Sequence, residues 1–264
     1  MRQLAGRVAV ITGAAHGIGL ALAEAFAVEG CRLVLADLEA PALEAAAGRL
    51  RTAGAQVLAM PTDVTREGDL QALAAVTIDT FGAAHILCAN AGVTLAGRPM
   101  SALSAADWRW VMEVNVMGAV NAMNAFLPIL KSQDEAHVMV TASGVGSFTG
   151  SAFNAPYSAS KAAALSLTES LYRELKTEAP HVGVTALCPG AVATTLRASE
   201  RRRPGAGAHD DPAAVRDHGL PASAVAQMSL AAIRDNRFWV ITHPQDGDIL
   251  EQRGRGARMG RDPA

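Results

Sequence analysis

Short apolar runs alternate with long alanine-rich stretches along most of this chain. The runs are almost continuously apolar, a pattern typical of strands whose two faces are both covered, as in a parallel sheet. Alternation of such strands with helices predicts right-handed βαβ crossovers. We therefore predict an α/β protein with a doubly wound Rossmann fold, in which helices cover both faces of a seven-stranded, mainly parallel sheet. The predicted strands are Val8–Thr12, Arg32–Asp37, Gln56–Thr62, His85–Asn90, His137–Ser143, Val182–Pro189 and Phe238–Thr242, and the predicted helices include Gly17–Glu29, Pro41–Ala53, Glu67–Phe81, Ala105–Leu130 and Tyr157–Glu178.

The alternation continues to Pro189 without a linker, so we predict one domain over residues 1–264. The pattern breaks at Ala191–Pro221, a long polar stretch with few strand signals. Loops of this length in compact domains are usually functional, and we interpret this one as a loop that covers the substrate. Residues 245–264 carry arginines among glycines, which predicts a flexible, solvated tail.

The composition excludes several classes of protein. The formal net charge of −2 lacks the basic excess of a nucleic-acid binder. No apolar stretch approaches the roughly 18 residues of a membrane span, and no targeting segment is visible, so we expect a cytoplasmic protein. Three cysteines lie far apart in apolar runs, which predicts buried, reduced thiols instead of disulfides. His209 and His218 have no partners at metal-ligand spacing, so we expect no metal.

A glycine-rich turn, Thr12 to Gly19, follows the first strand and opens the first helix. Glycines let the backbone approach a pyrophosphate, which then rests on the helix N-terminus. Between a strand and a helix at the start of a βαβ unit, the turn predicts a dinucleotide site.

The second predicted strand ends at Asp37. A carboxylate there accepts hydrogen bonds from the ribose hydroxyls of adenosine and repels a 2′-phosphate. Arg32 lies at the other end of the strand, and position 16 is His instead of Arg. These features favour NAD(H) over NADP(H); a helix cap is the structural alternative for Asp37.

Tyr157 and Lys161 are four residues apart in a predicted helix, so they share one face of it. An unperturbed phenol has a pKa of about 10. A neighbouring cation favours the phenolate and lowers that pKa, which suits a group that exchanges a proton with an alcohol or carbonyl oxygen.

Two further polar residues accompany this pair. Ser143 ends the fifth predicted strand, and ligands of doubly wound sheets bind beyond the carboxyl ends of strands. Asn115 lies inside an otherwise apolar helix, where an asparagine is unfavourable without a specific role.

In these features the chain resembles the short-chain dehydrogenase/reductase family, of the single-domain NAD(H) type. The resemblance covers residues 8 to about 195 and implies an oxidoreductase that moves a hydride between NAD(H) and a secondary alcohol or ketone. The motifs that carry it, in the family's order, are Thr12–Gly19, Asp37, Asp63-Val64, Asn90-Ala91-Gly92, Asn115, Ser143, Tyr157 with Lys161, and Pro189-Gly190.

The resemblance implies a role for each matching position. Tyr157 would be the acid/base, Lys161 would bind the nicotinamide ribose and lower the tyrosine pKa, and Ser143 would orient the substrate oxygen. Asn115 would hold a proton-relay water at a helix kink. The implied cofactor-binding residues are Gly13, His16, Gly17, Ile18, Gly19, Asp37, Leu38, Asp63 and Val64 (adenine), Asn90 (adenosine ribose), Ala91, Gly92, Tyr157, Lys161, Pro189, Gly190 and Val192 (nicotinamide), and Thr194 (carboxamide or pyrophosphate).

Two departures from the family pattern are present. The gap from Ser143 to Tyr157 is one residue longer than usual, and Thr141 and Ser147 are the alternatives to Ser143. The usual glycine-rich ending is replaced by Phe238–Pro244. That ending, the run Gly146–Ala152, and the sequence His218-Gly219-Leu220 are similar to bacterial members that oxidise benzylic alcohols of aryl ethers.

The substrate region leaves several alternatives open. Arg201, Arg202 and Arg203 form either a solvated charge run or a site for a carboxylate or phosphate. The candidate pocket walls, each equally compatible with core packing, are Leu95, Phe148, Phe153 and Leu196.

Alternative functions also remain. They are an NADPH-linked reductase of the 3-ketoacyl type and a catalytically silent dinucleotide sensor or scaffold. Alanine- and leucine-rich faces on the long helices Ala105–Leu130 and Tyr157–Glu178 predict a homodimer or homotetramer.

Overall fold

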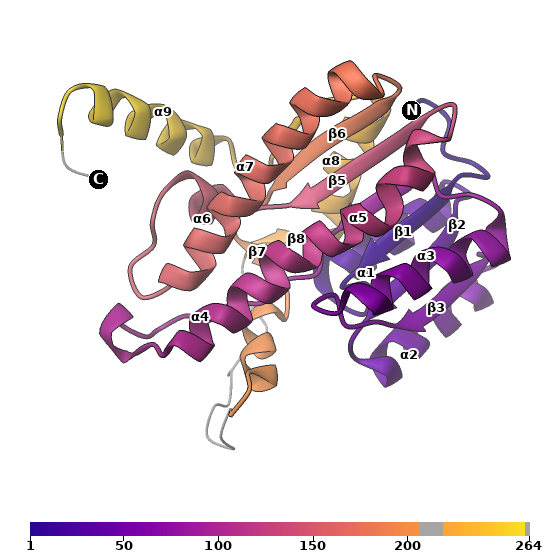
Figure 1. Cartoon of the computed structure of the whole chain (residues 1–264), viewed down its shortest axis with the longest axis horizontal. Helices are drawn as coiled ribbons and strands as arrows, with labels where there is room; N and C mark the ends of the chain where they lie inside the picture. Colours follow the sequence, from indigo (N-terminus) through magenta and orange to yellow (C-terminus); the bar gives the residue numbers. More distant parts are fainter. Residues whose placement is uncertain (206–218, 262–264) are drawn as a thin grey trace.

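A parallel sheet of seven strands forms the centre of the protein (Figure 1). The structure is a computed structural model that describes residues 1–205 and 219–261. The strand order is β3-β2-β1-β4-β5-β6-β9, and every pairing in this sheet is parallel. This confirms the predicted doubly wound α/β fold. The strands are β1 (Val8–Thr12), β2 (Arg32–Asp37), β3 (Val57–Pro61), β4 (Ile86–Ala89), β5 (Ala136–Thr141), β6 (Val182–Cys188) and β9 (Trp239–Ile241).

Helices cover both faces of this sheet. One face carries α1, α2 and α8, and the opposite face carries α3, α5 and α7 (Figure 1). The longer helices are α1 (Gly17–Val28), α2 (Ala40–Thr52), α3 (Glu67–Phe81), α4 (Ala105–Met112), α5 (Gly118–Lys131), α7 (Ala155–Glu178), α8 (Ala222–Arg234) and α9 (Pro244–Arg258). Shorter elements are the 3₁₀ turns η1 (Met100–Ala102) and η3 (Leu196–Arg202), the π-helical turn η2 (Glu113–Met117), the short helix α6 (Gly144–Phe148), and the paired strands β7 (Val192–Ala193) and β8 (Leu220–Pro221).

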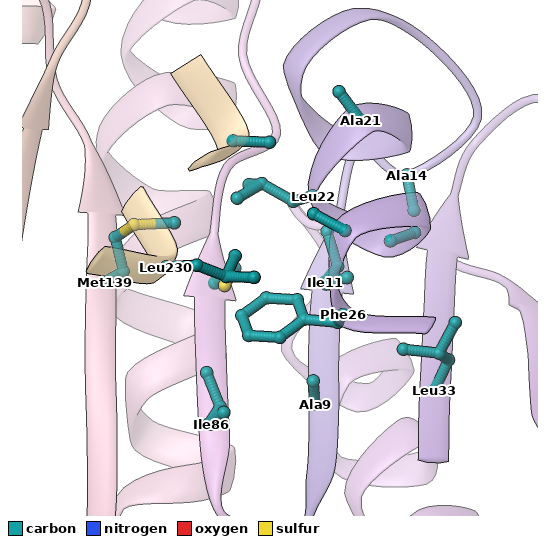
Figure 2. Close-up of a cluster of buried hydrophobic side chains, with 14 of the residues drawn as sticks. Ala9, Ile11, Ala14, Ala21, Leu22, Phe26, Leu33, Ile86, Met139 and Leu230 are labelled. Atoms are coloured by element: carbon teal, nitrogen blue, oxygen red, sulfur yellow. The ribbon is translucent and has the colours of Figure 1, made fainter. Parts of the chain in front are cut away.

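The central strands are buried on both faces, which explains their continuous apolar sequences. Every residue of β1, β4, β5 and β6 is buried. Figure 2 shows Phe26 of α1 packed between Ile11, Ile86 and Leu230, which come from β1, β4 and α8. Hydrophobic burial of this kind attaches α1 to the sheet and so fixes the direction of its N-terminus. The three cysteines are buried and free, as the sequence predicted.

The C-terminal region differs from the sequence prediction. We expected a flexible tail over residues 245–264, but Pro244–Arg258 forms helix α9, which extends away from the body of the molecule (Figure 1). Its start is anchored: Asp246 is buried, and Arg253 donates a hydrogen bond to the carbonyl of Phe148 at 2.9 Å. The glycine-rich, arginine-rich composition concealed this helix. No helix in the described part of the chain is long and apolar enough to cross a membrane.

The predicted loop Ala191–Pro221 contains ordered elements at its two ends. Strands β7 and β8 pair with each other, and η3 follows β7. His209 and His218 lie outside the described residues. His218 is also the first residue of the run His218-Gly219-Leu220, which resembles benzylic alcohol dehydrogenases.

A buried histidine joins two central strands. His137 of β5 is 1% exposed, and its Nε2 lies 2.8 Å from the hydroxyl of Thr185 on β6. That hydroxyl donates to the carbonyl of Arg237 at 2.7 Å, so we assign the proton to Nε2 of a neutral His137. Burial lowers the pKa of His137 to about 3.

This buried imidazole makes stability depend on pH. Between pH 6.5 and about 3 the unfolded chain binds a proton at His137 that the native protein does not, so its contribution to stability is lost as the pH falls. As the pH falls, the free energy of unfolding should decrease less steeply in His137→Gln than in the wild-type protein. The two slopes should differ by about 1 kcal/mol per pH unit. Urea denaturation between pH 4.5 and 6 measures this slope. His181→Gln, at an exposed position, is the control, and equal slopes in all three proteins would contradict the prediction.

Candidate active site

The candidate site lies at the carboxyl ends of β1 and β4, where the strand order reverses direction. The chain runs outward from β1 to β3 and then returns to β4 on the other side of β1. Such a switch point leaves a crevice between the loops that follow the two strands, and ligands of open α/β sheets bind there. Three adjoining cavities occupy this crevice, with Gly13, Asp37, Tyr157 and Thr194 each shared between two of them.

The glycine-rich turn brings the backbone close to one of these cavities, here called the first cavity, which Gly13, His16 and Gly17 line. Gly13 has φ +66° and Gly17 has φ +53°, conformations that side chains other than glycine rarely adopt. A Cβ on Gly13 would lie 2.9 Å from Cα of Ala91. Helix α1 begins at this turn without an acidic residue in its first turn and without a capping bond from His16. Its N-terminal amides are therefore available to an anion, and the turn fits the pyrophosphate of a dinucleotide.

Hydrogen bonds hold this turn to the next strand. The side-chain amide of Asn90 donates to the carbonyl of Thr12 at 3.0 Å, and the hydroxyl of Thr12 accepts from the backbone amides of Asn90 and Ala91. We expected Asn90 to meet the adenosine ribose. Its Oδ1 also accepts from the hydroxyl of Thr141 at 3.1 Å, and Asn90 lines the first cavity, so the ribose contact stays a prediction. Thr12, which the sequence analysis assigned no separate role, is the partner that positions it.

Asp37 is fixed at the adenosine end. Its Oδ2 accepts from the backbone amide of Ala15 and its Oδ1 from that of Glu39, each at 3.0 Å. Asp37 lines the first cavity and also the adjoining one, where Leu38, Asp63 and Val64 lie. The three residues implied to meet the adenine side of a dinucleotide therefore surround one cavity.

Lys161 and Tyr157 project from the same face of α7. The Lys161 Nζ lies 5.8 Å from the centre of the Tyr157 ring and donates to the carbonyl of Thr141 at 2.8 Å. Lys161 is buried, and this burial lowers its pKa to about 8. A buried ammonium beside a phenol stabilises the phenolate, and it loses its own proton more readily than an exposed lysine.

Ser143 and Tyr157 converge on the second cavity, which Gly146 also lines and which we call the substrate cavity. A Cβ on Gly146 would lie 3.0 Å from the Ser143 hydroxyl and 2.9 Å from Cε1 of Tyr157, so both side chains approach the same point. The two alternatives to Ser143 are engaged elsewhere. The Thr141 hydroxyl donates to Asn90, and the Ser147 hydroxyl donates to the carbonyl of Lys161 at 2.9 Å. The geometry therefore favours Ser143 as the serine that faces the substrate.

Asn115 lies behind the site, in the π-helical turn η2. Its Oδ1 accepts from the backbone amide of Val93 at 2.7 Å. Its Nδ2 donates to the carbonyl of Val93 and to the hydroxyl of Ser160. The side chain thus ties the helix to the segment after β4 and to α7. π-Helical turns inside α-helices occur frequently at functional sites.

The structure brings the predicted site residues together. Of them, only Gly19 and Asn115 do not line one of the three cavities. A Cβ on Gly19 would lie 2.7 Å from Nδ2 of Asn90, so this glycine permits close packing beneath the turn. The predicted residues that line a cavity are Gly13, His16, Gly17, Ile18, Asp37, Leu38, Asp63, Val64, Asn90, Ala91, Gly92, Ser143, Tyr157, Lys161, Pro189, Gly190, Val192 and Thr194.

The substrate cavity, of about 360 Å³, is also lined by residues that were not among the predicted site residues. Val145 and Gly146 come from α6, Gly146 and Ser151 belong to the run Gly146–Ala152, and Ala191 and Arg197 belong to the predicted substrate loop. No local motif marks the other three, Thr94, Ala96 and Asn154. Of the candidate wall residues, Leu196 lines the cavity. Phe148 and Leu95 are fully buried in the core, and Phe153 is exposed.

The loop arginines form ion pairs. Arg201 and Arg202 both pair with Glu39, and Arg203 pairs with the buried Asp107 at 2.7 Å. The Arg201 side chain remains 53% exposed, so this run is both paired and partly solvated. The sequence could not identify these partners, which lie about 100 to 160 positions away in the chain. Residues 1–205 and 219–261 contain no cluster of three metal-ligating side chains.

Comparison with known proteins identifies related chains. The family model for short chain dehydrogenases matches residues 7–205. A solved short-chain dehydrogenase/reductase from Burkholderia phymatum in complex with NAD superposes with a TM-score of 0.93, at 39% identity over 100% of this chain and 98% of that one.

Two characterised relatives cover most of the chain. A 1-deoxy-11-beta-hydroxypentalenate dehydrogenase from Streptomyces exfoliatus is 36% identical over 91% of this chain and 84% of its own. A C alpha-dehydrogenase from a Sphingobium species is 31% identical over 96% and 85%.

The three hydrogen bonds of Asn115 predict a loss of stability when it is truncated. Asn115→Ala leaves the buried amide and carbonyl of Val93 without partners, which we expect to lower the free energy of unfolding by about 2–4 kcal/mol. Chemical denaturation measures the change. Asn124→Ala, at an exposed position on α5, is the control and should be nearly neutral. Equal stability of the two variants would show that the Asn115 contacts do not support the fold.

Proposed function

Because the chain belongs to the short-chain dehydrogenase family, we propose that it transfers a hydride between NAD(H) and a secondary alcohol or ketone, with Tyr157 as the acid/base. The observation that carries this proposal is the convergence of Tyr157 and Ser143 on one cavity, with Lys161 buried beside the tyrosine. The dinucleotide cavity adjoins that point and shares Tyr157 and Pro189 with the substrate cavity.

The residues have separate tasks in this reaction. The bound nicotinamide supplies or accepts the hydride. Ser143 donates a hydrogen bond that orients the substrate oxygen, and the Tyr157 hydroxyl exchanges a proton with that oxygen. The Lys161 ammonium stabilises the phenolate that Tyr157 becomes when it gives up its proton. Asn115 helps to position Tyr157 and Lys161, because its hydrogen bond to Ser160 holds α7 against the π-helical turn.

We propose NAD(H) as the preferred dinucleotide. Asp37 presents a carboxylate where the adenosine ribose is expected, and a 2′-phosphate there would meet its negative charge. The short-chain dehydrogenase/reductase from Burkholderia phymatum, which superposes with a TM-score of 0.93, was solved with NAD. This preference also argues against the alternative of an NADPH-linked 3-ketoacyl reductase. The alternative of a silent sensor lacks support, because Asn115, Ser143, Tyr157 and Lys161 are all present.

An unbalanced charge at the substrate cavity favours an anionic substrate. Arg197 lines this cavity, and among the described residues no acidic side chain does. Arg197 has no ion pair within the described residues, whereas Arg201, Arg202 and Arg203 each have one. One relative is named for a hydroxylated carboxylate, a hydroxypentalenate. We therefore propose that the preferred substrates carry a carboxylate together with the secondary alcohol.

We also propose that the chain assembles as a homodimer or homotetramer. The long helices α5 and α7, which cover one face of the sheet, carry apolar side chains that are partly exposed, among them Leu127 and Leu167. Light scattering after size-exclusion chromatography measures the mass of the assembly, and a monomer would contradict this proposal.

Replacement of Tyr157 tests the central role. Tyr157→Phe should reduce kcat by at least about 100-fold, because acid/base catalysis contributes this much or more, while NADH still binds. Fluorescence titration measures binding, and NAD⁺ reduction on a set of secondary alcohols, including benzylic ones, measures turnover. Tyr172→Phe, on the same helix, is the matched control. Near-normal turnover by Tyr157→Phe would refute the assignment.

Replacement of Arg197 tests the substrate class. The wild-type protein should favour a hydroxy acid over its methyl ester by about tenfold in kcat/KM, as expected for one charge-assisted hydrogen bond. Arg197→Gln should lose this preference through a higher KM for the acid. Arg173→Gln, at an exposed position on α7, should retain it. If Arg197→Gln kept the full preference for the acid, the cavity would not use this cation.

A further inference from the structure

Glu39 connects two arginines and a histidine beside the adenosine end of the crevice. Its Oε2 lies 3.2 Å from Nε2 of His16, and its Oε1 lies 2.9 Å from Nη2 of Arg201. Arg202 also pairs with Oε1. His16 comes from the glycine-rich turn, Glu39 follows β2, and the arginines come from η3. One carboxylate therefore joins segments that are far apart in the sequence.

Arg202 and His16 lie where a ribose 2′-substituent is expected. Arg202 and Asp37 both line the cavity at the glycine-rich turn and the adjoining adenine-side cavity, so they lie at the junction of the two. His16 lines the first of these cavities. In dinucleotide sites of this fold, an arginine at this point is what accommodates the 2′-phosphate of NADP(H). The chain thus contains cations suited to NADP(H) next to an aspartate suited to NAD(H).

Glu39 occupies part of the hydrogen-bonding capacity of the two arginines. Its side chain is 24% exposed and that of Arg202 is 26% exposed, so the pair is partly shielded from solvent. The Nε of Arg202 is buried and has no partner within the described residues, which leaves this guanidinium with a donor to spare. Burial lowers the pKa of His16, Asp37 opposes this, and Arg202 and Arg201 lower it further. The arginine charges therefore reach the ring of His16.

The anchoring of η3 keeps the arginines in place. Ser199 accepts from the backbone amide of Thr94 at 3.1 Å, and Glu200 accepts from that of Ala96 at 3.0 Å. Arg203 pairs with Asp107, which forms the capping box of α4 together with Ser104. The segment that carries Arg201 and Arg202 is thus attached, before and after the two arginines, to residues that follow β4, and these contacts hold it beside the crevice.

We propose that Glu39 is a second determinant of cofactor choice, which discriminates against NADP(H) by holding Arg201 and Arg202 in ion pairs and His16 in a hydrogen bond. This inference rests on the proposed function, because it assumes that a dinucleotide binds in the crevice. Asp37 repels a 2′-phosphate directly, and Glu39 withholds the groups that would bind it. Removal of Glu39 alone should therefore increase affinity for a 2′-phosphate even though Asp37 remains.

Two mononucleotide probes isolate this effect from catalysis. 5′-AMP and adenosine 2′,5′-bisphosphate differ only in the 2′-phosphate, so the ratio of their dissociation constants, measured by calorimetry, reports its binding. Glu39→Gln should shift this ratio by about tenfold toward the bisphosphate, as expected when charge-assisted hydrogen bonds become available. Glu44→Gln removes the same charge from an exposed position on α2 and should leave the ratio unchanged.

A triple variant tests the role of the arginines. Glu39→Gln combined with Arg201→Gln and Arg202→Gln should lose the gain. An unchanged ratio in Glu39→Gln, or the same gain in the triple variant, would overturn this inference while the wild-type affinity for 5′-AMP still supported the proposed function. A wild-type protein that binds neither probe would contradict the proposed function and this inference together.

Discussion

The hydrogen bonds between Asn90 and the Thr12–Gly13 turn are the interaction on which the rest of the site depends. They join the carboxyl ends of β1 and β4 at the point where the strand order reverses. From Asn90 the network continues through Thr141 on β5 to Lys161 on α7. A single chain of side-chain and backbone contacts therefore sets the distance between the dinucleotide turn and the proposed acid/base pair, since buried polar groups must find partners.

Burial gives the charged groups of this crevice their properties. Lys161 lies among buried residues of α7 and β5, and its pKa is lowered because the ammonium is poorly solvated there. At the outer end, Arg201 and Arg202 share Glu39, so one carboxylate compensates part of their charge before any ligand arrives. Among the described residues Arg197 lacks an ion pair, and it borders the proposed substrate cavity. Paired arginines therefore lie at the adenosine side of the crevice, and an arginine without such a pair lies at the other cavity.

Local sequence patterns predicted the sheet and most of the site residues. Strands β1 and β2 begin and end at the predicted residues, because a strand buried on both faces needs an unbroken apolar run. Helix α9 escaped prediction, since glycines and arginines are weak evidence for a helix and its anchor, Asp246, packs beside Gly190 from another part of the chain. The pairing of Arg203 with Asp107 also escaped prediction, because a long-range ion pair leaves no periodic signal in the sequence.

The sequence by itself determined the doubly wound fold, the family, and the residues gathered around the crevice, because strand burial, a glycine turn and helix spacing are all local constraints. Only the tertiary structure decided what those residues contact. It engaged Thr141 and Ser147 in hydrogen bonds within the protein, joined Asn90 to the glycine-rich turn, and paired Arg201 and Arg202 with Glu39. Each of these outcomes depends on which segments meet in space, and the packing of helices against the sheet sets that arrangement.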